Sequence, residues 1–127
     1  MKISIDLDGT LWAHMDFFRN FMKAIQLQNH KVGILTGHNL ENKQHDIDKM
    51  IANRFPIPDF YYGKETDQDK ATNGAYFKAR KIKEENIDIH FDDNDYDNPE
   101  TYRLVQQLGI QEKIFKVPHK GRGIQSE

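Results

Sequence analysis

The sequence predicts an α/β fold built around a mainly parallel sheet of five strands. Short apolar segments, typical of buried strands, alternate along the chain with longer segments whose apolar residues recur at helical spacing. This alternation favours right-handed crossovers between neighbouring strands, which make the strands parallel. The apolar segments place the five strands at residues 3–7, 32–36, 60–64, 87–91 and 113–117.

Four segments carry the amphipathic pattern of helices that pack against a sheet. In the first of them, Phe17, Phe18 and Phe21 fall on one apolar stripe. The predicted helices span approximately residues 16–25, 39–53, 70–85 and 99–108. Their N-caps are expected at Asp16, Asn39, Asp69 and Asn98, because short polar side chains at these positions can bond the first free amides of a helix.

Length and composition fit one domain. The chain has 127 residues, so we expect a single domain over residues 1–117 and a mobile tail over residues 118–127. The net charge of -2, with acids and bases interspersed, does not suggest a nucleic-acid-binding surface or a membrane-binding patch. No apolar run reaches the roughly 20 residues of a membrane helix.

The chain contains no cysteine, which excludes disulfides and thiol catalysis. It also shows no signal-peptide pattern, because Lys2 is followed directly by a short strand and acids. Together these features lead us to expect a cytoplasmic protein.

The start of the chain is its most informative segment. Asp6 stands at or near the carboxyl end of the first predicted strand, and Asp8 lies in the turn just beyond it. In an open α/β sheet, ligands bind outside the carboxyl ends of the strands. Two neighbouring acids there make a hard oxygen site suited to Mg²⁺. The alternative is an ordinary Asp-Gly turn after a strand.

Two further strand ends carry polar residues. The second predicted strand ends at Thr36, and the fourth leads into an acidic run that contains Asp92, Asp93 and Asp97. A solvated turn is the alternative for this run. A calcium loop is disfavoured because the run lacks the glycine and the distal glutamate of an EF-hand.

In this order, the strand ends resemble the motifs of the haloacid dehalogenase-like (HAD) phosphohydrolases. Residues 6–10, Asp-Leu-Asp-Gly-Thr, are similar to the first motif, Thr36 to the second, and residues 92–97 to the fourth. The resemblance covers approximately residues 2–108. It implies a three-layer α/β/α, Rossmann-like fold with strand order 5-4-1-2-3, in which the first and fourth strands lie side by side.

The third motif of the family is a lysine ahead of the fourth motif. Lys70 is favoured, because it lies just before a predicted helix at the spacing from Asp93 that many members show. Lys64, at a strand end, and Lys78, inside the predicted helix, are the alternatives.

The resemblance implies a Mg²⁺-dependent phosphatase that works through an aspartyl-phosphate. Asp6 is expected to be the nucleophile, and Asp8 the acid that protonates the leaving group. Lys70 is expected to neutralise charge on the nucleophile and the phosphate. The implied metal ligands are Asp6, the backbone carbonyl of Asp8, and Asp93, with Asp92 as the alternative to Asp93.

Phosphate oxygens are expected to be bound by the Thr36 side chain and by backbone amides at Gly9, Thr10 and Gly37. His38 is a candidate substrate contact, with a surface histidine at the start of a helix as the alternative. His90, inside a strand pattern, is expected to be a core residue with satisfied hydrogen bonds.

No segment of the chain is long enough for the cap domain that many family members insert, so we expect an open site. Expected substrates are phosphorylated small molecules or the ends of nucleic acids and other macromolecules, and an oligomer could close the site. One alternative is a phospho-accepting receiver-like module, although its acidic and hydroxyl residues follow a different strand order. Another is a catalytically silent binding protein with the HAD fold.

Overall fold

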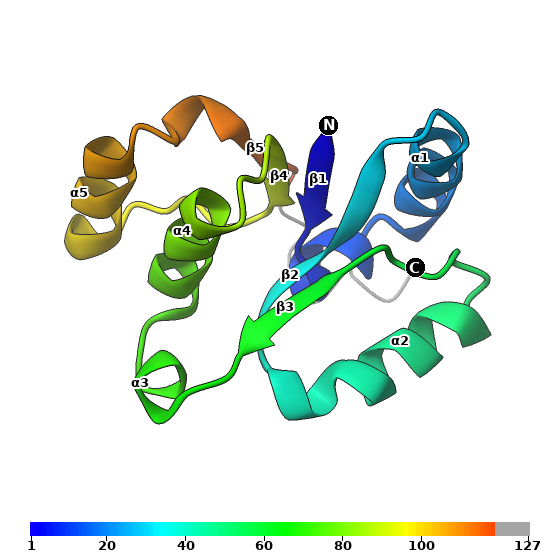
Figure 1. The fold of residues 1–127 in the computed structure, drawn as a ribbon, viewed down its shortest axis with the longest axis horizontal. Helices are drawn as coiled ribbons and strands as arrows, with labels where there is room; N and C mark the ends of the chain where they lie inside the picture. The colour runs from blue at the N-terminus through cyan, green and yellow to red at the C-terminus, as the bar shows by residue number, and fades with distance from the viewer. Residues whose placement is uncertain (119–127) are drawn as a thin grey trace.

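Five parallel strands form the central sheet, in the order β3-β2-β1-β4-β5 (Figure 1). The computed structural model describes residues 1–118 of the chain. The order confirms the expectation that the first and fourth strands lie side by side. The strands are β1 (Lys2–Ile5), β2 (Lys31–Asn39), β3 (Tyr61–Lys64), β4 (Ile89–Asp92) and β5 (Ile114–Lys116).

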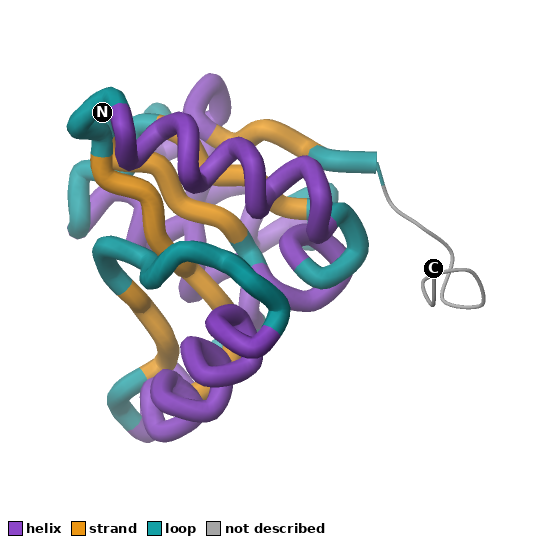
Figure 2. The backbone as a smooth tube through the Cα atoms, turned by 90° about the vertical axis from the view of Figure 1, so that its right-hand side faces the viewer, coloured by secondary structure: helices purple, strands orange, loops and turns teal. Residues whose placement is uncertain are grey.

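Helices cover both faces of the sheet, which makes the fold a three-layer α/β/α arrangement. In Figure 1, α1 and α2 lie on one side of the sheet, and α4 and α5 lie on the other. Figure 2 views the molecule from the side of α1 and α2 and shows the strands behind them. The helices are α1 (Met15–Leu27), α2 (Lys43–Ala52), the short α3 (Asp67–Lys70), α4 (Gly74–Glu84) and α5 (Pro99–Leu108).

Each face of the sheet has its own hydrophobic core. Phe18 and Met22 of α1 pack with Met50 of α2 against one face. Phe77 of α4 and Val105 of α5 belong to the core on the other face. Burying large apolar side chains contributes about 1.5–3 kcal/mol each, so both layers of helices are held to the sheet mainly by the hydrophobic effect.

The strand that carries Thr36 is longer than expected. β2 continues to Asn39, so Thr36 lies within this strand and not at its end. The register between β2 and β3 shifts between Leu35 and Asn39, which shows that the last part of β2 is irregular. The extension arises because β3 runs alongside and pairs Lys64 with Asn39.

The helix predicted from Lys70, with Asp69 as its N-cap, is wrong at its start. Thr66 and Asp69 form a capping box that closes the short helix α3, and Asn73 then caps α4, which begins at Gly74. The short helix α3 and the longer α4 replace the single predicted helix because Thr66, with an acid three residues later, is itself a helix-start signal. The displaced start matters for the site, since α4 carries one of its residues.

Of the N-caps predicted for the other helices, Asn98 is confirmed, whereas Asp16 and Asn39 are wrong. The Asn98 side chain accepts a hydrogen bond from the Glu100 amide, as expected for the cap of α5, and this helix ends at Gly109 with a φ of +65°. His14 occupies the N-cap position of α1, and Asp16 lies in its first turn. Asn39 makes no side-chain cap and is followed by a 3₁₀ turn before α2.

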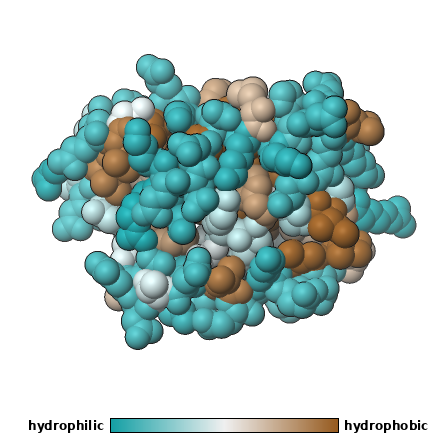
Figure 3. All heavy atoms as spheres, in the orientation of Figure 1, coloured by the Kyte–Doolittle hydropathy of each residue, from teal (hydrophilic) through white to brown (hydrophobic). Residues whose placement is uncertain are grey.

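The expected mobile tail lies outside the described residues, apart from Pro118. The carbonyl of Pro118 accepts a hydrogen bond from Nε2 of His14 at 2.9 Å. Polar side chains cover most of the face shown in Figure 3, and hydrophobic residues form separate patches on it. Within the described part of the chain, no helix has the length and apolar composition needed to cross a membrane.

We expect Gly33→Ala to destabilise the fold. A Cβ at Gly33 would overlap the backbone carbonyl oxygen of Phe60, and backbone yields less readily than a flexible side chain. The free energy of unfolding, measured by urea denaturation, should fall by about 1–3 kcal/mol. Gly37→Ala, in the same strand, is the control because its Cβ would find its nearest atom at 3.7 Å. Equal losses in the two variants would contradict this reading.

Candidate active site

Three carboxylates converge where the adjacent strands β1 and β4 end. Asp6 follows β1 directly, Asp92 is the last residue of β4, and Asp93 comes next. The amide of Asp6 donates a hydrogen bond to the carbonyl of Phe91 at 3.0 Å, which ties the two strand ends together. One oxygen from each carboxylate lies within 4.8 Å of the others. Of the three acids expected to converge, Asp6 and Asp93 do so, whereas the side chain of Asp8 does not belong to this group.

A buried lysine joins this cluster from α4. Nζ of Lys78 lies 2.6 Å from Oδ2 of Asp92 and 3.3 Å from Oδ1 of Asp6. Lys78 thus lies in the site, and the preference for Lys70 is corrected. Lys70 pairs with Glu41 at 2.6 Å on the surface. Lys64 donates to the carbonyl of Thr72.

The buried position of Lys78 left a trace in the sequence. Lys78 lies on the same helical face as Ala75, Ala79 and Ile82, which pack into the core. A lysine on the apolar face of a helix is expected to reach a buried acid, because an unpaired buried charge is costly. Because the helix was predicted to begin at about Lys70 and not at Gly74, Lys70 was preferred although Lys78 lies on the apolar face.

Asp92 is nearly saturated by hydrogen bonds. Besides Lys78, its Oδ2 accepts from the Tyr96 hydroxyl at 2.7 Å and from Nε2 of His90 at 3.0 Å, and its Oδ1 accepts from the Asn94 amide. An ionised carboxylate offers roughly four lone-pair positions. Asp92 is therefore better suited to orienting Lys78 than to binding a metal directly.

His90 is the core residue that the sequence predicted. Its ring is fully buried and lies 2.7 Å from Oγ of Ser4 through Nδ1. Burial lowers the pKa of His90, so the neutral ring donates from Nε2 to Asp92 and accepts from Ser4. Tyr96, which the sequence did not single out, completes the shell around Asp92.

The cluster carries more negative than positive charge. Burial raises the pKa of Asp6 to about 7, Lys78 opposes this effect, and the neighbouring Asp92 and Asp93 add to it. Although burial disfavours its charged form, hydrogen bonds from His90 and the charge of Lys78 hold the pKa of Asp92 well below its usual range. A divalent cation would supply the missing positive charge and favour ionised Asp6.

Gly9 and Thr10, which follow Asp8, each help to place the acids of the cluster. Gly9 has a φ of +76°, and a Cβ on it would overlap the carboxylate of Asp93. The Thr10 hydroxyl accepts from the Asp93 amide at 3.0 Å and lies 3.2 and 3.3 Å from Oδ1 of Asp93 and Oδ2 of Asp6. Gly9 therefore makes room for Asp93, and Thr10 holds the two acids together.

Thr36 lies on the neighbouring strand, just beyond the level of Asp6. β1 and β2 pair Ile5 with Ile34, which places Thr36 two residues past that pair. Its side chain is buried, and its hydroxyl accepts from the His38 amide at 3.1 Å. The hydroxyl proton of Thr36 can then point to another acceptor. Gly37 follows it, with Gly74 at the start of α4 as its neighbour.

Asp8 is placed differently from the other acids. Its side chain is 74% exposed, and its Oδ2 lies 2.6 Å from Nε2 of His38. Asp8 does not belong to the group of three acids that could hold a metal through side chains. This arrangement is compatible with the expectation that only its backbone carbonyl would contact a metal.

His38 forms a second polar chain that the sequence did not predict. Its Nδ1 lies 2.9 Å from Oδ2 of Asp46, and the Tyr61 hydroxyl donates to the same oxygen at 2.5 Å. A hydrogen bond to Asp8, opposed in part by burial and reinforced by Asp46, raises the pKa of His38 to about 9. The ring is therefore protonated at neutral pH and donates from both nitrogens.

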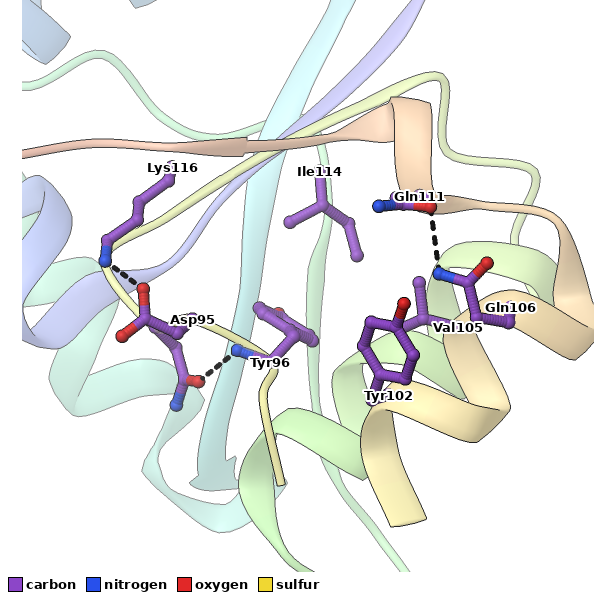
Figure 4. A pocket seen from close by; sticks show the side chains of 9 residues that line it. Asp95, Tyr96, Tyr102, Val105, Gln106, Gln111, Ile114 and Lys116 are labelled. Atoms are coloured by element: carbon purple, nitrogen blue, oxygen red, sulfur yellow. Dashed lines mark hydrogen bonds and ion pairs between the residues drawn. The ribbon is translucent and has the colours of Figure 1, made fainter. Parts of the chain in front are cut away.

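Open cavities adjoin the carboxylate cluster. One of about 410 Å³ is lined by Asp93, Asn94, Asp95, Asp97 and Lys116. A second, of about 290 Å³, shares three of these residues and continues between α5 and β5 (Figure 4). Tyr96 lines this second cavity and also donates its hydroxyl to Asp92, so the cavity borders the buried cluster.

The chain was compared with family models, curated proteins and solved structures, and none of them matches it. What the site can do is therefore inferred from its own geometry and chemistry.

We expect Lys78→Met to destabilise the protein by about 3–5 kcal/mol, because it leaves two buried carboxylates without their cation. Urea denaturation measures this loss. Lys70→Met is the matched control, and its effect should be small because the Lys70–Glu41 pair lies on the surface. Similar losses in both variants would show that the buried ion cluster does not hold the site together.

The protonated His38 ring should stabilise the folded state up to alkaline pH. Because its pKa is raised from 6.5 to about 9, the stabilisation is complete below about pH 6.5 and is lost as the pH rises through 9. An NMR titration of the ring should give a midpoint near 9 and a lower one in Asp46→Asn. A midpoint near 6.5 that does not change in Asp46→Asn would contradict the contacts of the His38 ring with Asp8 and Asp46.

Proposed function

We propose that this protein is a Mg²⁺-dependent phosphatase that hydrolyses a phosphate monoester through an aspartyl-phosphate on Asp6. The observation that carries the proposal is the cluster of Asp6, Asp92 and Asp93 beside the buried Lys78. The cluster lies at the carboxyl ends of adjacent parallel strands, where α/β folds bind ligands.

The donor set fits Mg²⁺. The ion prefers oxygen ligands and is usually held by one or two carboxylates together with substrate phosphate. Asp6 and Asp93 are the carboxylates we propose as its ligands, with the Asp8 carbonyl as a third, and Asp92 is the alternative that its own hydrogen bonds disfavour. When bound, Mg²⁺ would neutralise charge that develops on the transferred phosphoryl group.

Asp6 is the proposed nucleophile. A carboxylate oxygen of Asp6 bonds to phosphorus while the bond from phosphorus to the leaving oxygen breaks, and that oxygen takes a proton from Asp8. Water then attacks the phosphorus of the aspartyl-phosphate. Inorganic phosphate leaves, Asp6 is regenerated, and Asp8 takes up the proton that the water loses.

Lys78 replaces Lys70 in the proposed mechanism. Its ammonium group already contacts Asp6 and can neutralise charge on the nucleophile and on the phosphate. Thr36 would donate its hydroxyl proton to a phosphate oxygen, and backbone amides at Gly9, Thr10 and Gly37 would supply further donors. Phosphoryl transfer depends mainly on such positioning and electrostatic stabilisation.

We also propose that the fold is that of a small, capless HAD-like phosphatase. The support is the strand order together with the acids at β1 and β4, as the sequence resemblance implies. The cavity beside Asp93 would leave room for the rest of the substrate. We propose phosphorylated small molecules or phosphorylated ends of macromolecules as the substrate class.

We expect the wild type to hydrolyse an aryl phosphate in Mg²⁺ and to lose this activity in EDTA. Asp6→Asn should abolish turnover because the nucleophile is gone, and Asp8→Asn should reduce it by roughly 10²–10⁴-fold. Release of phosphate is the measurement. A wild type without activity toward any phosphate ester would instead favour a silent binding protein, and unchanged activity in Asp6→Asn would exclude the proposed nucleophile.

Asp93→Asn should raise the Mg²⁺ concentration needed for half-maximal activity more than Asp97→Asn does. Asp93 belongs to the carboxylate cluster, whereas Asp97 does not. Mg²⁺ titrations of the two variants measure the difference, and each replaces one acid of the same loop with its amide. The reverse ranking would overturn the assignment of Asp93 as a ligand.

A further inference from the structure

His38 connects the proposed acid of the site to the protein core. It lies near the end of β2 and contacts Asp8, from the loop after β1, through Nε2. Through Nδ1 it contacts Asp46, which belongs to α2 and is only 4% exposed. The two contacts use both nitrogens of the ring, so the orientation of His38 is fixed at both ends.

The buried end of this chain is itself anchored. The Tyr61 hydroxyl, from β3, donates to the same oxygen of Asp46 that accepts from His38. The backbone amide of His38 also donates to the Thr36 hydroxyl. His38 is therefore held by Thr36 of its own strand and by Asp46 of α2, which Tyr61 of β3 anchors in turn.

Asp8 needs such a support. Its side chain is largely exposed, and it lies in a loop whose next residue, Gly9, has a φ of +76°. Among the described residues, only His38 bonds the Asp8 carboxylate. An exposed carboxylate without a partner samples several rotamers, whereas a general acid must lie within hydrogen-bond reach of one oxygen atom.

We infer that His38 is a positioning residue that holds the Asp8 carboxyl group in place for protonation of the leaving oxygen. The bond from Nε2 fixes Oδ2 of Asp8 and leaves Oδ1 as the atom that would carry the proton. Because the same bond lowers the pKa of Asp8, the carboxylate would take up that proton when a bound phosphate adds its negative charge beside it. Asp46 and Tyr61 extend the support into the core. This inference rests on the proposed phosphatase function and adds to it a residue that does not itself touch the reacting atoms.

The two amide replacements of histidine separate the two contacts of the ring. Glutamine places its amide near the position of Nε2 and can still donate to Asp8. Asparagine places its amide near the position of Nδ1, where it can donate to Asp46 but not reach Asp8. His38→Gln should therefore retain the function that His38→Asn loses.

The test compares two substrates in each variant. Phenyl phosphate has a poor leaving group that needs protonation, and dinitrophenyl phosphate has a good one that does not. Because Asp8 also takes the proton from water in the second step, which both substrates share, the comparison uses kcat/KM, which reports only the steps up to departure of the leaving group. We expect His38→Asn to lower kcat/KM for phenyl phosphate by about 10–10²-fold, with little change for dinitrophenyl phosphate. His38→Gln should lie near the wild type. The ratio of the two rates does not depend on how much of a variant is folded.

Two further variants complete the test. His45→Asn makes the same replacement at an exposed histidine of α2 and should leave the substrate ratio unchanged. In the Asp8→Asn background, adding His38→Asn should cause no further loss, because His38 acts through Asp8. An equal loss for both substrates in His38→Asn, or additive losses in the double variant, would overturn the inference.

The outcome also separates this inference from the proposed function. A wild type that hydrolyses neither substrate would overturn the phosphatase proposal, and the role of His38 with it. A wild type with Mg²⁺-dependent turnover, together with a His38→Asn variant whose substrate ratio is normal, would overturn the role of His38 alone.

Discussion

The ion cluster of Lys78 with Asp6 and Asp92 is the interaction on which the candidate site depends. It joins the end of β1 to the second turn of α4 and the end of β4, two elements that come much later in the sequence. All three side chains are buried, and each would cost several kcal/mol in the interior without its partners. The hydrogen bonds from His90 and Tyr96 satisfy Asp92, and Thr10 links Asp6 to Asp93. The geometry of the carboxylates is therefore set before any ligand arrives, as the proposed stabilisation of a transferred phosphoryl group would require.

Much of the fold could be predicted from the sequence, because local patterns report it. The apolar segments located all five strands, and the cap formed by Asn98 with Pro99 located α5. The region from Thr66 to Gly74 was predicted wrongly because two helix-start signals lie there within eight residues, and a single sequence does not show that both are used. The extension of β2 past Thr36 depends on β3 alongside it, which is a tertiary contact that no local pattern contains.

Only those residues of the candidate site that stand at the end of a strand or directly after it could be predicted from the sequence. Asp6, Asp92 and Asp93 follow strands whose ends meet at one edge of the sheet, so their convergence follows from the topology. Lys78 carried a signal, a charge on an apolar helix face, but the helix start was placed too early to favour it. The contacts of His38 with Asp8 and Asp46 could not be foreseen, since they depend on how the loop after β1 and helix α2 approach the end of β2. The family resemblance is the source of the roles proposed for the acids, while the contacts in the structure are the source of the roles proposed for Lys78 and His38.

The most direct test of the proposed chemistry is a crystal structure of the protein grown with Mg²⁺ and beryllofluoride, which mimics a phosphoryl group on a carboxylate. We expect the beryllium to be bonded to an Asp6 oxygen, the Mg²⁺ to contact Asp6 and Asp93, and Nζ of Lys78 to contact a fluorine atom. The cluster brings these groups within reach of one another without rearrangement of the fold. An adduct on a different residue, or a crystal without any adduct at Asp6 under these conditions, would contradict the assignment of Asp6 as the nucleophile.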